Sequence, residues 1–183
     1  MNVAADRFRL VMGRFATGVT VVTTLHAGRP AGITVNALSS VSLDPPLVMV
    51  ALDRARFITP MMRATGRYAV NVLAQDQQAL ADCFAGAPVT PDRAAFCGAA
   101  WRPGSTGLPV LDGAIAALEC TVVQTFSAGD HDLFVALVDT LEGALEPAEA
   151  ESSGPLVYYR RRYRRLDPDE GLPLHGKPEH RAG

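Results

Sequence analysis

The sequence has little of what marks several common classes of protein. It holds three cysteines, Cys83, Cys97 and Cys120, with no C-x-x-C pair and irregular spacing. An odd, scattered set of thiols favours a reducing compartment with buried thiols over a disulfide framework or a zinc site. The longest apolar run, residues 45–52, is far too short to span a bilayer, and the charged N-terminus lacks a signal-peptide core. We therefore expect a cytoplasmic protein with no membrane partner.

The sequence also lacks an excess of positive or negative charge and the common nucleotide-binding and metal-binding motifs. The 17 basic residues balance 19 acidic ones, so a nucleic-acid partner is not expected. None of the four histidines has partners at metal-ligand spacing, and we expect no metal site. G-x-G-x-x-G and G-x-S-x-G do not occur. Residues 171–177 spell G-x-x-x-x-G-K, but Pro178 stands where a P-loop needs Ser or Thr.

The sequence does contain enough apolar residues to form the core of one globular domain, since 48% of its 183 residues are hydrophobic. Apolar periodicity and turn residues predict helices over 8–15, 59–66 and 76–86. Strands are predicted over 19–24, 33–36, 45–52, 68–73, 114–127, 132–145 and 155–163. Regular helices do not separate these strands, which favours an antiparallel barrel with a few peripheral helices over a parallel sheet. We expect one domain over residues 1–166 and a polar tail over 167–183.

Two polar stretches stand out, and each has a plain alternative. Residues 32–46 bring serine hydroxyls and uncharged backbone N–H groups between two apolar strands. Such a stretch can cradle a planar polar ring and a phosphate, or it can be an ordinary serine-rich connection. Residues 158–165 interleave tyrosines with arginines. They form either a solvated edge strand with one arginine turned inward, or a site in which Arg160 binds a cofactor phosphate.

The segment TVNALSSVSLDPPLVMVALDR, residues 34–54, resembles the flavin-reductase-like family, whose members have an FMN-binding split barrel. Residues 8–24, 68–73, 80–86, 129–138 and 155–163 resemble further motifs of that family in the same order, so the resemblance covers residues 6–166. It implies a mainly β protein, a Greek-key antiparallel split β-barrel with a few peripheral helices. It also implies a homodimer with flavin near the subunit interface.

The activity that this resemblance implies is NAD(P)H-dependent flavin reduction, with FMN or FAD as acceptor and NADH or NADPH as donor. The partner would be a flavin-dependent monooxygenase that receives the reduced flavin. Hydride passes between the two cofactors, so no catalytic side chain and no metal is expected. Two alternatives remain: an oxidase with tightly bound flavin, and a non-catalytic split-barrel protein that holds flavin or haem.

The resemblance also assigns cofactor contacts to residues of this chain. Those expected along the flavin ring and ribityl chain are Thr34, Val35, Asn36 and Ala37. Those expected towards the ribityl chain and phosphate are Ser39, Ser40 and Ser42. Asp53, Arg54 and Arg56 follow the next strand, where the family places flavin contacts. We expect Arg56 to supply the phosphate cation, because a guanidinium fork suits a phosphate. His131, on a Gly-Asp-His turn, is expected to contact the nicotinamide nucleotide, unless it is a turn histidine bonded within its own hairpin.

Overall fold

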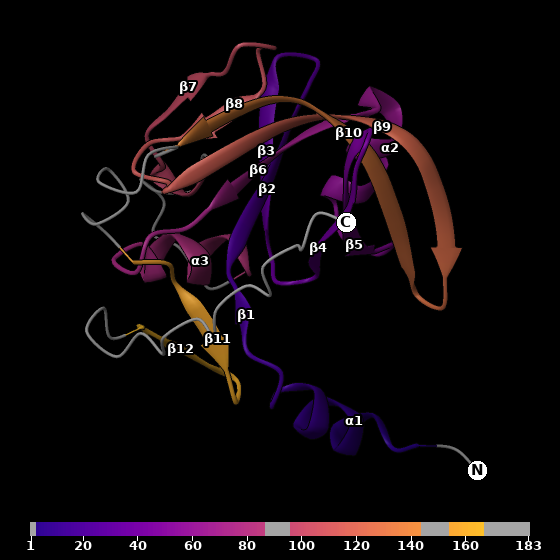
Figure 1. The fold of residues 1–183 in the computed structure, drawn as a ribbon, viewed down its shortest axis with the longest axis vertical. Coiled ribbons are helices and arrows are strands. Elements are labelled where there is room, and N and C mark those ends of the chain that lie inside the picture. Colours follow the sequence, from indigo (N-terminus) through magenta and orange to yellow (C-terminus); the bar gives the residue numbers. More distant parts are fainter. Residues whose placement is uncertain (1–2, 87–95, 144–153, 167–183) are drawn as a thin grey trace, which may run out of the picture.

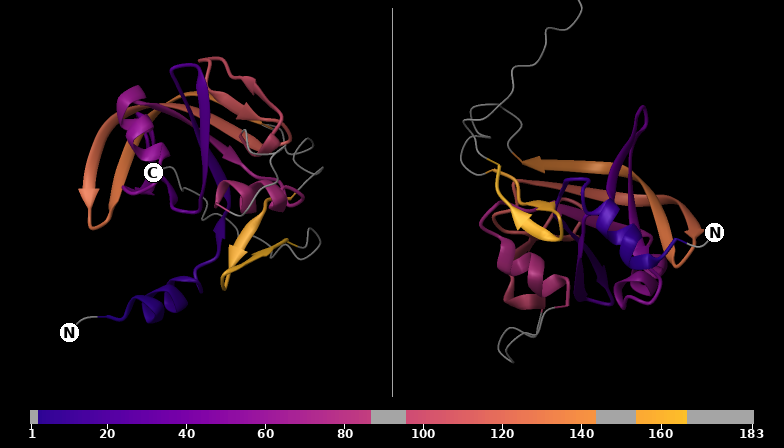
Figure 2. Two further views of the ribbon diagram at one scale, coloured as in Figure 1. Left: turned by 180° about the vertical axis from the view of Figure 1, so that it is seen from behind. Right: turned by 90° about the horizontal axis from the view of Figure 1, so that it is seen from below.

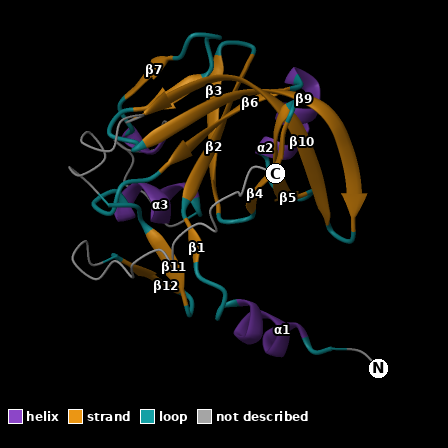
Figure 3. Cartoon of the chain, in the orientation of Figure 1, coloured by secondary structure: helices purple, strands orange, loops and turns teal. Residues whose placement is uncertain are grey.

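The computed structural model describes residues 3–86, 96–143 and 154–166. The tail over 167–183, its G-x-x-x-x-G-K segment and a helical turn considered at residues 90–91 lie outside these ranges. The helices are α1 (Ala5–Met12), α2 (Ile58–Thr65), α3 (Gln78–Phe84) and the 3₁₀ turn η2 (Phe96–Gly98). The strands are β1 (Thr17–Gly18), β2 (Thr20–His26), β3 (Arg29–Val35), β4 (Leu38–Leu43), β5 (Pro46–Asp53), β6 (Arg67–Val72), β7 (Trp101–Pro103), β8 (Pro109–Leu111), β9 (Ala116–Ala128), β10 (His131–Gly143), β11 (Val157–Tyr159) and β12 (Arg162–Arg164) (Figures 1 and 3).

Most strands join one antiparallel sheet that curls on itself. Its seven strands follow the order β3-β2-β6-β9-β10-β5-β4. The two edge strands, β3 and β4, are consecutive in the chain and are joined by Asn36 and Ala37. The Ala51 N–H donates to the Ala37 carbonyl at 3.1 Å, and the Thr20 hydroxyl donates to the Val35 carbonyl at 2.7 Å. The two edges of the sheet therefore meet at one corner, and the mainly β split-barrel prediction is confirmed.

Two apolar clusters hold the sheet together, one on each face of β2. The inner cluster includes Val22, Val50, Tyr68 and Phe134, and the Tyr68 hydroxyl donates to the Phe134 carbonyl at 3.3 Å. Burial raises the pKa of Tyr68 far above its usual value, so this hydroxyl stays a donor. The outer cluster lies beneath α3 and the β11–β12 hairpin, and its largest buried members are Leu73, Phe84 and Leu156. Residues 20–24 of β2 are consequently buried on both faces.

A buried carboxylate fixes the loop between β7 and β8. Glu119 of β9 is fully buried and accepts hydrogen bonds from the Thr106 N–H at 3.0 Å, the Leu108 N–H at 3.3 Å and the Thr140 hydroxyl at 3.0 Å. Burial alone would raise the pKa of Glu119, but the hydrogen bonds from Thr106, Thr140 and Leu108 outweigh it and lower that pKa. The charged form therefore stabilises the fold.

Several predicted elements need correction. Helix α1 begins at Ala5 and ends at Met12, whereas the prediction was 8–15, and none of its side chains is buried. The stretch over 155–163 is not one strand but the β11–β12 hairpin, because Arg160 and Arg161 turn the chain with positive φ angles. The serine-rich segment after Ala37 is strand β4 rather than a loop. Strand β5 alternates in burial, although every residue from Leu47 to Leu52 is apolar.

The cysteine prediction is wrong for two of the three residues. Cys83 on α3 and Cys97 in η2 form a disulfide. Their separation of 14 residues matches no local motif, and only the packing of η2 against α3 brings the two sulfurs together. Cys120 is a buried free thiol as expected, and burial raises its pKa to about 12.

Candidate functional site

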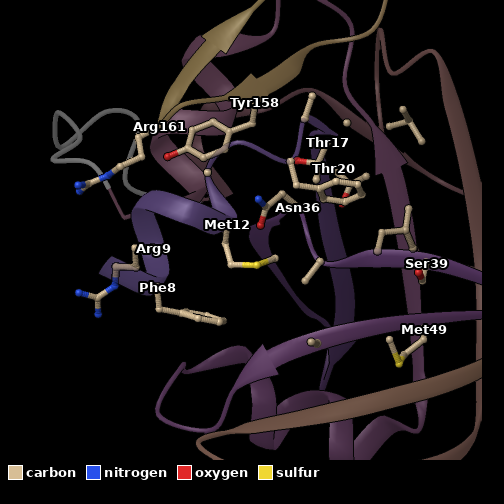
Figure 4. Close-up of a pocket in the computed structure, with 18 residues that line it drawn as sticks. Phe8, Arg9, Met12, Thr17, Thr20, Asn36, Ser39, Met49, Tyr158 and Arg161 are labelled. Atoms are coloured by element: carbon tan, nitrogen blue, oxygen red, sulfur yellow. The ribbon is translucent and has the colours of Figure 1, made fainter. Parts of the chain in front are cut away.

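A cleft of about 890 Å³ opens where the two edges of the sheet meet, and we call it the corner cleft. Helix α1, the start of β2, the β3–β4 corner, β5 and β11 all contribute to it. Among its lining residues are Phe8, Met12, Thr17, Asn36, Ser39, Met49 and Tyr158 (Figure 4). Thr17, Thr20, Asn36 and Tyr158 lie near one another in Figure 4, whereas Arg9 and Arg161 extend outward beside α1.

The alternation of β5 supplies one wall of this cleft. Val48, Val50 and Leu52 point into the inner core, so Met49 and Ala51 between them face the cleft. Ala37 and Gly18 also line the cleft. The small side chains at Gly18, Ala37 and Ala51 leave room for a flat ring to approach the backbone closely.

Thr17 gives the clearest sign that this cleft can bind a ligand. Among the side chains of the described ranges, its hydroxyl oxygen is the one buried polar atom that has no hydrogen-bond partner. A buried hydroxyl without a partner costs free energy unless a ligand or water satisfies it. Asn36 and Ser39 add an amide and a second hydroxyl to the same lining. The cleft therefore offers neutral hydrogen-bonding groups around a mostly apolar space, which suits a planar heterocycle.

The predicted ring-binding residues divide between the cleft and the surrounding fold. Asn36, Ala37 and Ser39 line the cleft together. Thr34 instead donates its hydroxyl to the Ala81 carbonyl of α3 at 2.6 Å, and Val35 is buried in the inner core. Thr34 and Val35 point to opposite faces of the sheet because they are neighbours on the pleated strand β3.

Ser40 and Ser42 are not among the residues that line the cleft. Ser40 is exposed, and its backbone pairs with Val48 of β5. The pairing of β4 with β5 is irregular between Ser40 and Ser42, and Ser42 pairs with Leu47. The serine-rich segment therefore contributes only Ser39 to the lining of the cleft.

A second group of predicted residues lies at the tip shared by β5, β9 and β10. His131 pairs with Asp53, and the Arg54 N–H and guanidinium donate to the carbonyls of Asp130 and Gly129. Arg56 lies 4.0 Å from the Asp53 carboxylate. These residues do not line the corner cleft, although Asp53 lies on the same face of β5 as Ala51, two residues further along the strand.

His131 makes the hydrogen bond expected of a turn histidine. Its Nδ1 lies 2.6 Å from the Asp130 carboxylate. This hydrogen bond is the main cause that lowers the pKa of Asp130. The His131 side chain remains 43% exposed, so its ring is also accessible to a ligand.

Sequence reasoning missed the contributions of the N-terminal segment and of β11. Phe8, Met12, Thr17 and Tyr158 all line the cleft. The periodicity of α1 correctly indicated one apolar face, but it did not show that this face lies beside a ligand cleft. Arg160 lies in the turn of the β11–β12 hairpin and lines a separate hollow next to α1.

The described ranges contain neither a metal-ligand cluster nor a membrane-spanning helix. In the three described ranges, no three His, Cys, Asp or Glu side chains gather in a way that could hold a metal ion. None of the helices in these ranges has the length and apolar character that a membrane crossing needs.

Comparison with known proteins gives a consistent result. The family described as "Flavin reductase like domain" matches residues 12–167. The NADH-dependent flavin reductase of a Rhodococcus species is 41% identical over 162 residues, which cover 87% of this chain and 85% of that protein. The reductase subunit HsaB of a flavin-dependent monooxygenase from Mycobacterium tuberculosis is 33% identical over 172 residues, covering 94% and 88%.

Solved structures agree with these relatives. The flavin reductase PheA2 superimposes with a TM-score of 0.81 at 36% identity, covering 90% of this chain and 99% of that one. The NADH:FAD oxidoreductase SgcE6 of Streptomyces globisporus, solved with NAD and FAD fragments, gives a TM-score of 0.79 at 32% identity. The match covers 93% of this chain and 99% of that one.

Proposed function

Because the chain belongs to the flavin-reductase-like family, we propose that its corner cleft is where flavin and reduced nicotinamide meet. The protein is an NAD(P)H-dependent flavin reductase, an oxidoreductase that uses NADH or NADPH and FMN or FAD. Its relatives include reductase subunits of two-component monooxygenases. The observation that supports the cleft as the site is the buried Thr17 hydroxyl, which lacks a partner beside a floor of small side chains.

The residues of the cleft fit a flavin by size and by polarity. A flavin held in this cleft would supply the acceptor for the hydride of the reduced nicotinamide, a transfer that requires no protein nucleophile. Asn36, Ser39 and Thr17 would form hydrogen bonds with the polar edge of the flavin ring and with the ribityl hydroxyls. The backbone at Ala37 borders the same space, and Thr34 and Val35 would act only through their backbone groups. The role of these residues is to hold two rings in contact and to exclude water.

The tip of β5 and β10 extends this proposed site. Arg56 carries a guanidinium suited to the flavin phosphate, and Arg54 and Asp53 hold the tip in place through hydrogen bonds to the neighbouring turn and backbone. His131 would orient the nicotinamide nucleotide through its exposed ring edge. Ser40 and Ser42 lie outside the cleft, so in this arrangement they contribute to β4 rather than to the ligand.

We propose a homodimer, supported by apolar surface that this chain does not cover by itself. Helix α1 projects from the barrel in two different views (Figures 1 and 2), and Phe8, Val11 and Met12 on it are all at least half exposed. Val41 and Leu43 of β4 are further exposed apolar side chains. A second copy of the chain is the occupant we infer, because α1 also lines the cleft and covering it would close the site.

Three further points belong to the same proposal. Residues 1–166 would form one domain, which the family match over 12–167 supports. The reduced flavin would leave the cleft and reach a separate monooxygenase, as the names of several relatives suggest. A cytoplasmic location is proposed because the reaction draws on NAD(P)H, although the Cys83–Cys97 disulfide is uncommon in that compartment.

An NAD(P)H oxidation assay with FMN, FAD and riboflavin in parallel tests the proposed function. We expect the purified protein to contain little flavin and to oxidise NADH or NADPH only when flavin is added. Stoichiometric flavin after purification would instead favour an oxidase with bound cofactor. Flavin binding without any NAD(P)H oxidation would overturn the proposal in favour of a non-catalytic flavin-binding protein.

A further inference from the structure

We propose that a hollow lined by four arginines beside α1 binds a phosphate group of the nucleotide whose rings occupy the corner cleft. The hollow has a volume of about 300 Å³, and we call it the arginine hollow. Its basic lining residues are Arg7, Arg14, Arg160 and Arg161. The inference rests on the proposed function, because it takes the ligand of the corner cleft to be a flavin or nicotinamide nucleotide.

The arginine hollow borders the corner cleft. Gly13 and Arg161 line both. The Arg160 N–H donates to the Gly13 carbonyl at 2.7 Å, which joins the turn of the β11–β12 hairpin to the end of α1. A Cβ added at Gly13 would lie 3.7 Å from the Arg161 Cγ, so the Arg161 side chain lies close to the Gly13 backbone. A ligand with its rings in the cleft can therefore extend an anionic group into the hollow.

The charges of these arginines are not balanced by carboxylates in the described part of the chain, although the Arg160 guanidinium lies 5.7 Å from the centre of the Tyr159 ring. Arg9, Arg63 and Arg102 each pair with a carboxylate, whereas Arg7, Arg14, Arg160 and Arg161 form no ion pair with any described residue. Four like charges around one hollow repel one another, and an anion placed between them would relieve that repulsion. A guanidinium binds phosphate through two parallel hydrogen bonds, which makes phosphate the fitting class of anion.

The backbone that presents two of these arginines is also unusual. Arg160 and Arg161 form the two-residue turn of the hairpin, with φ angles of 52° and 62°. Turns with two positive φ angles normally contain Asn-Gly, because a Cβ is disfavoured in that conformation. Side chains held in such a conformation are commonly found where a ligand is bound. Placing two arginines there costs folding free energy that binding a phosphate would offset.

The test compares a turn variant with a matched control on the same hairpin. In Arg160→Asn/Arg161→Gly the turn receives its preferred residues, so we expect an unchanged or higher Tm together with weaker phosphate binding. Arg7→Ala removes a third guanidinium from the exposed side of α1. Arg164→Ala, an arginine on β12 that does not line the hollow, is the control. Dissociation constants for riboflavin, FMN and FAD and KM values for NADH and NADPH are measured for each protein.

The pattern of losses identifies the ligand or refutes the site. We expect the turn variant and Arg7→Ala to bind one class of phosphate-bearing ligand roughly ten- to a hundredfold more weakly, with riboflavin unaffected. A loss for FMN and FAD assigns the hollow to the flavin phosphate, and a loss confined to NADH or NADPH assigns it to the nicotinamide nucleotide. Including Arg56→Ala in the same assays shows which of the two cofactors Arg56 serves.

Two other results separate failure of the hollow from failure of the proposed function. If wild-type protein oxidises NAD(P)H with riboflavin but the variants bind every ligand as the Arg164→Ala control does, the hollow has no phosphate role. The same conclusion follows if riboflavin and FMN weaken equally. If wild-type protein oxidises NAD(P)H with none of the flavins, the proposed function itself fails.

Discussion

Strands β2 and β5 lie in the same sheet but meet different surroundings. Residues 20–24 of β2 are all buried, because the inner cluster covers one face and the outer cluster the other. On β5 only Val48, Val50 and Leu52 are buried, and the alternate residues Met49 and Ala51 face the corner cleft. The side of the barrel at β2 is thus covered by the chain itself, and we call it the closed side. The side at β5 faces the corner cleft, and we call it the open side.

This difference separates stability from function within one sheet. The two apolar clusters supply the buried apolar surface, and burial of that surface drives folding. The open side carries the unpartnered Thr17 hydroxyl and the exposed apolar face of α1. We therefore expect substitutions on the closed side to change the free energy of unfolding, and those on the open side to change ligand binding or association.

The largest effect is expected in the inner core. Phe134→Ala should lower the free energy of unfolding by about 3–5 kcal/mol, since Phe134 is fully buried and its removal leaves a cavity. Leu141→Ala on the same strand removes a side chain that is 62% exposed and should change it by about 0.5 kcal/mol or less. Urea unfolding of both variants measures these changes. Equal losses of unfolding free energy would contradict the expected difference between the buried and the exposed position.

The next largest effect concerns association through α1. Phe8→Asp places a charge on the exposed apolar face of that helix, and we expect it to weaken the dimer by about 1.5–3 kcal/mol per protomer. Light scattering over a dilution series measures the dissociation. Arg9→Ala, on the same helix, is the control. A wild-type protein that is monomeric at micromolar concentration would contradict the homodimer.

At the tip of β10, His131→Ala should impair the use of NAD(P)H with little change in flavin affinity. Losing one hydrogen bond to the nucleotide should cost about 1–3 kcal/mol, roughly 5- to 150-fold in kcat/KM. The two readouts are the flavin Kd by fluorescence quenching and kcat/KM for NAD(P)H at saturating flavin. Unchanged kinetics in a folded variant would show that His131 does not contact the nucleotide and serves only in its hydrogen bond with Asp130.

A smaller and pH-dependent effect is expected at Glu119. Its pKa is lowered in the folded protein, so its contribution to stability is present above the ordinary carboxyl pKa and is lost as pH falls through the folded value. Glu119→Gln should cost about 1–2 kcal/mol near neutral pH and less in acid. Thermal unfolding of both proteins across a pH series measures this difference. A difference in stability that does not change with pH would show that the charge of Glu119 does not contribute to it.

The sequence predicted the closed side better than the open side. The β-branched run of β2 and the paired lengths of β9 and β10 carry strong local signals, and both were recognised. The corner residues Asn36, Ala37 and Ser39 were found through a family resemblance. Thr17 and Tyr158 were missed because only the folded barrel brings the N-terminal segment and β11 to that corner. The Cys83–Cys97 pairing was missed for the same reason.

Flavin binding by an Ala51→Phe variant tests the division between the two sides most directly. Ala51 faces the corner cleft, whereas its neighbours Val50 and Leu52 point into the core. A phenyl ring at this position should fill the floor of the cleft without entering the core. In a fluorescence titration with FMN we predict that binding is lost while the Tm stays within a few degrees of wild type. Wild-type affinity for FMN in the folded variant would contradict the corner cleft as the flavin site.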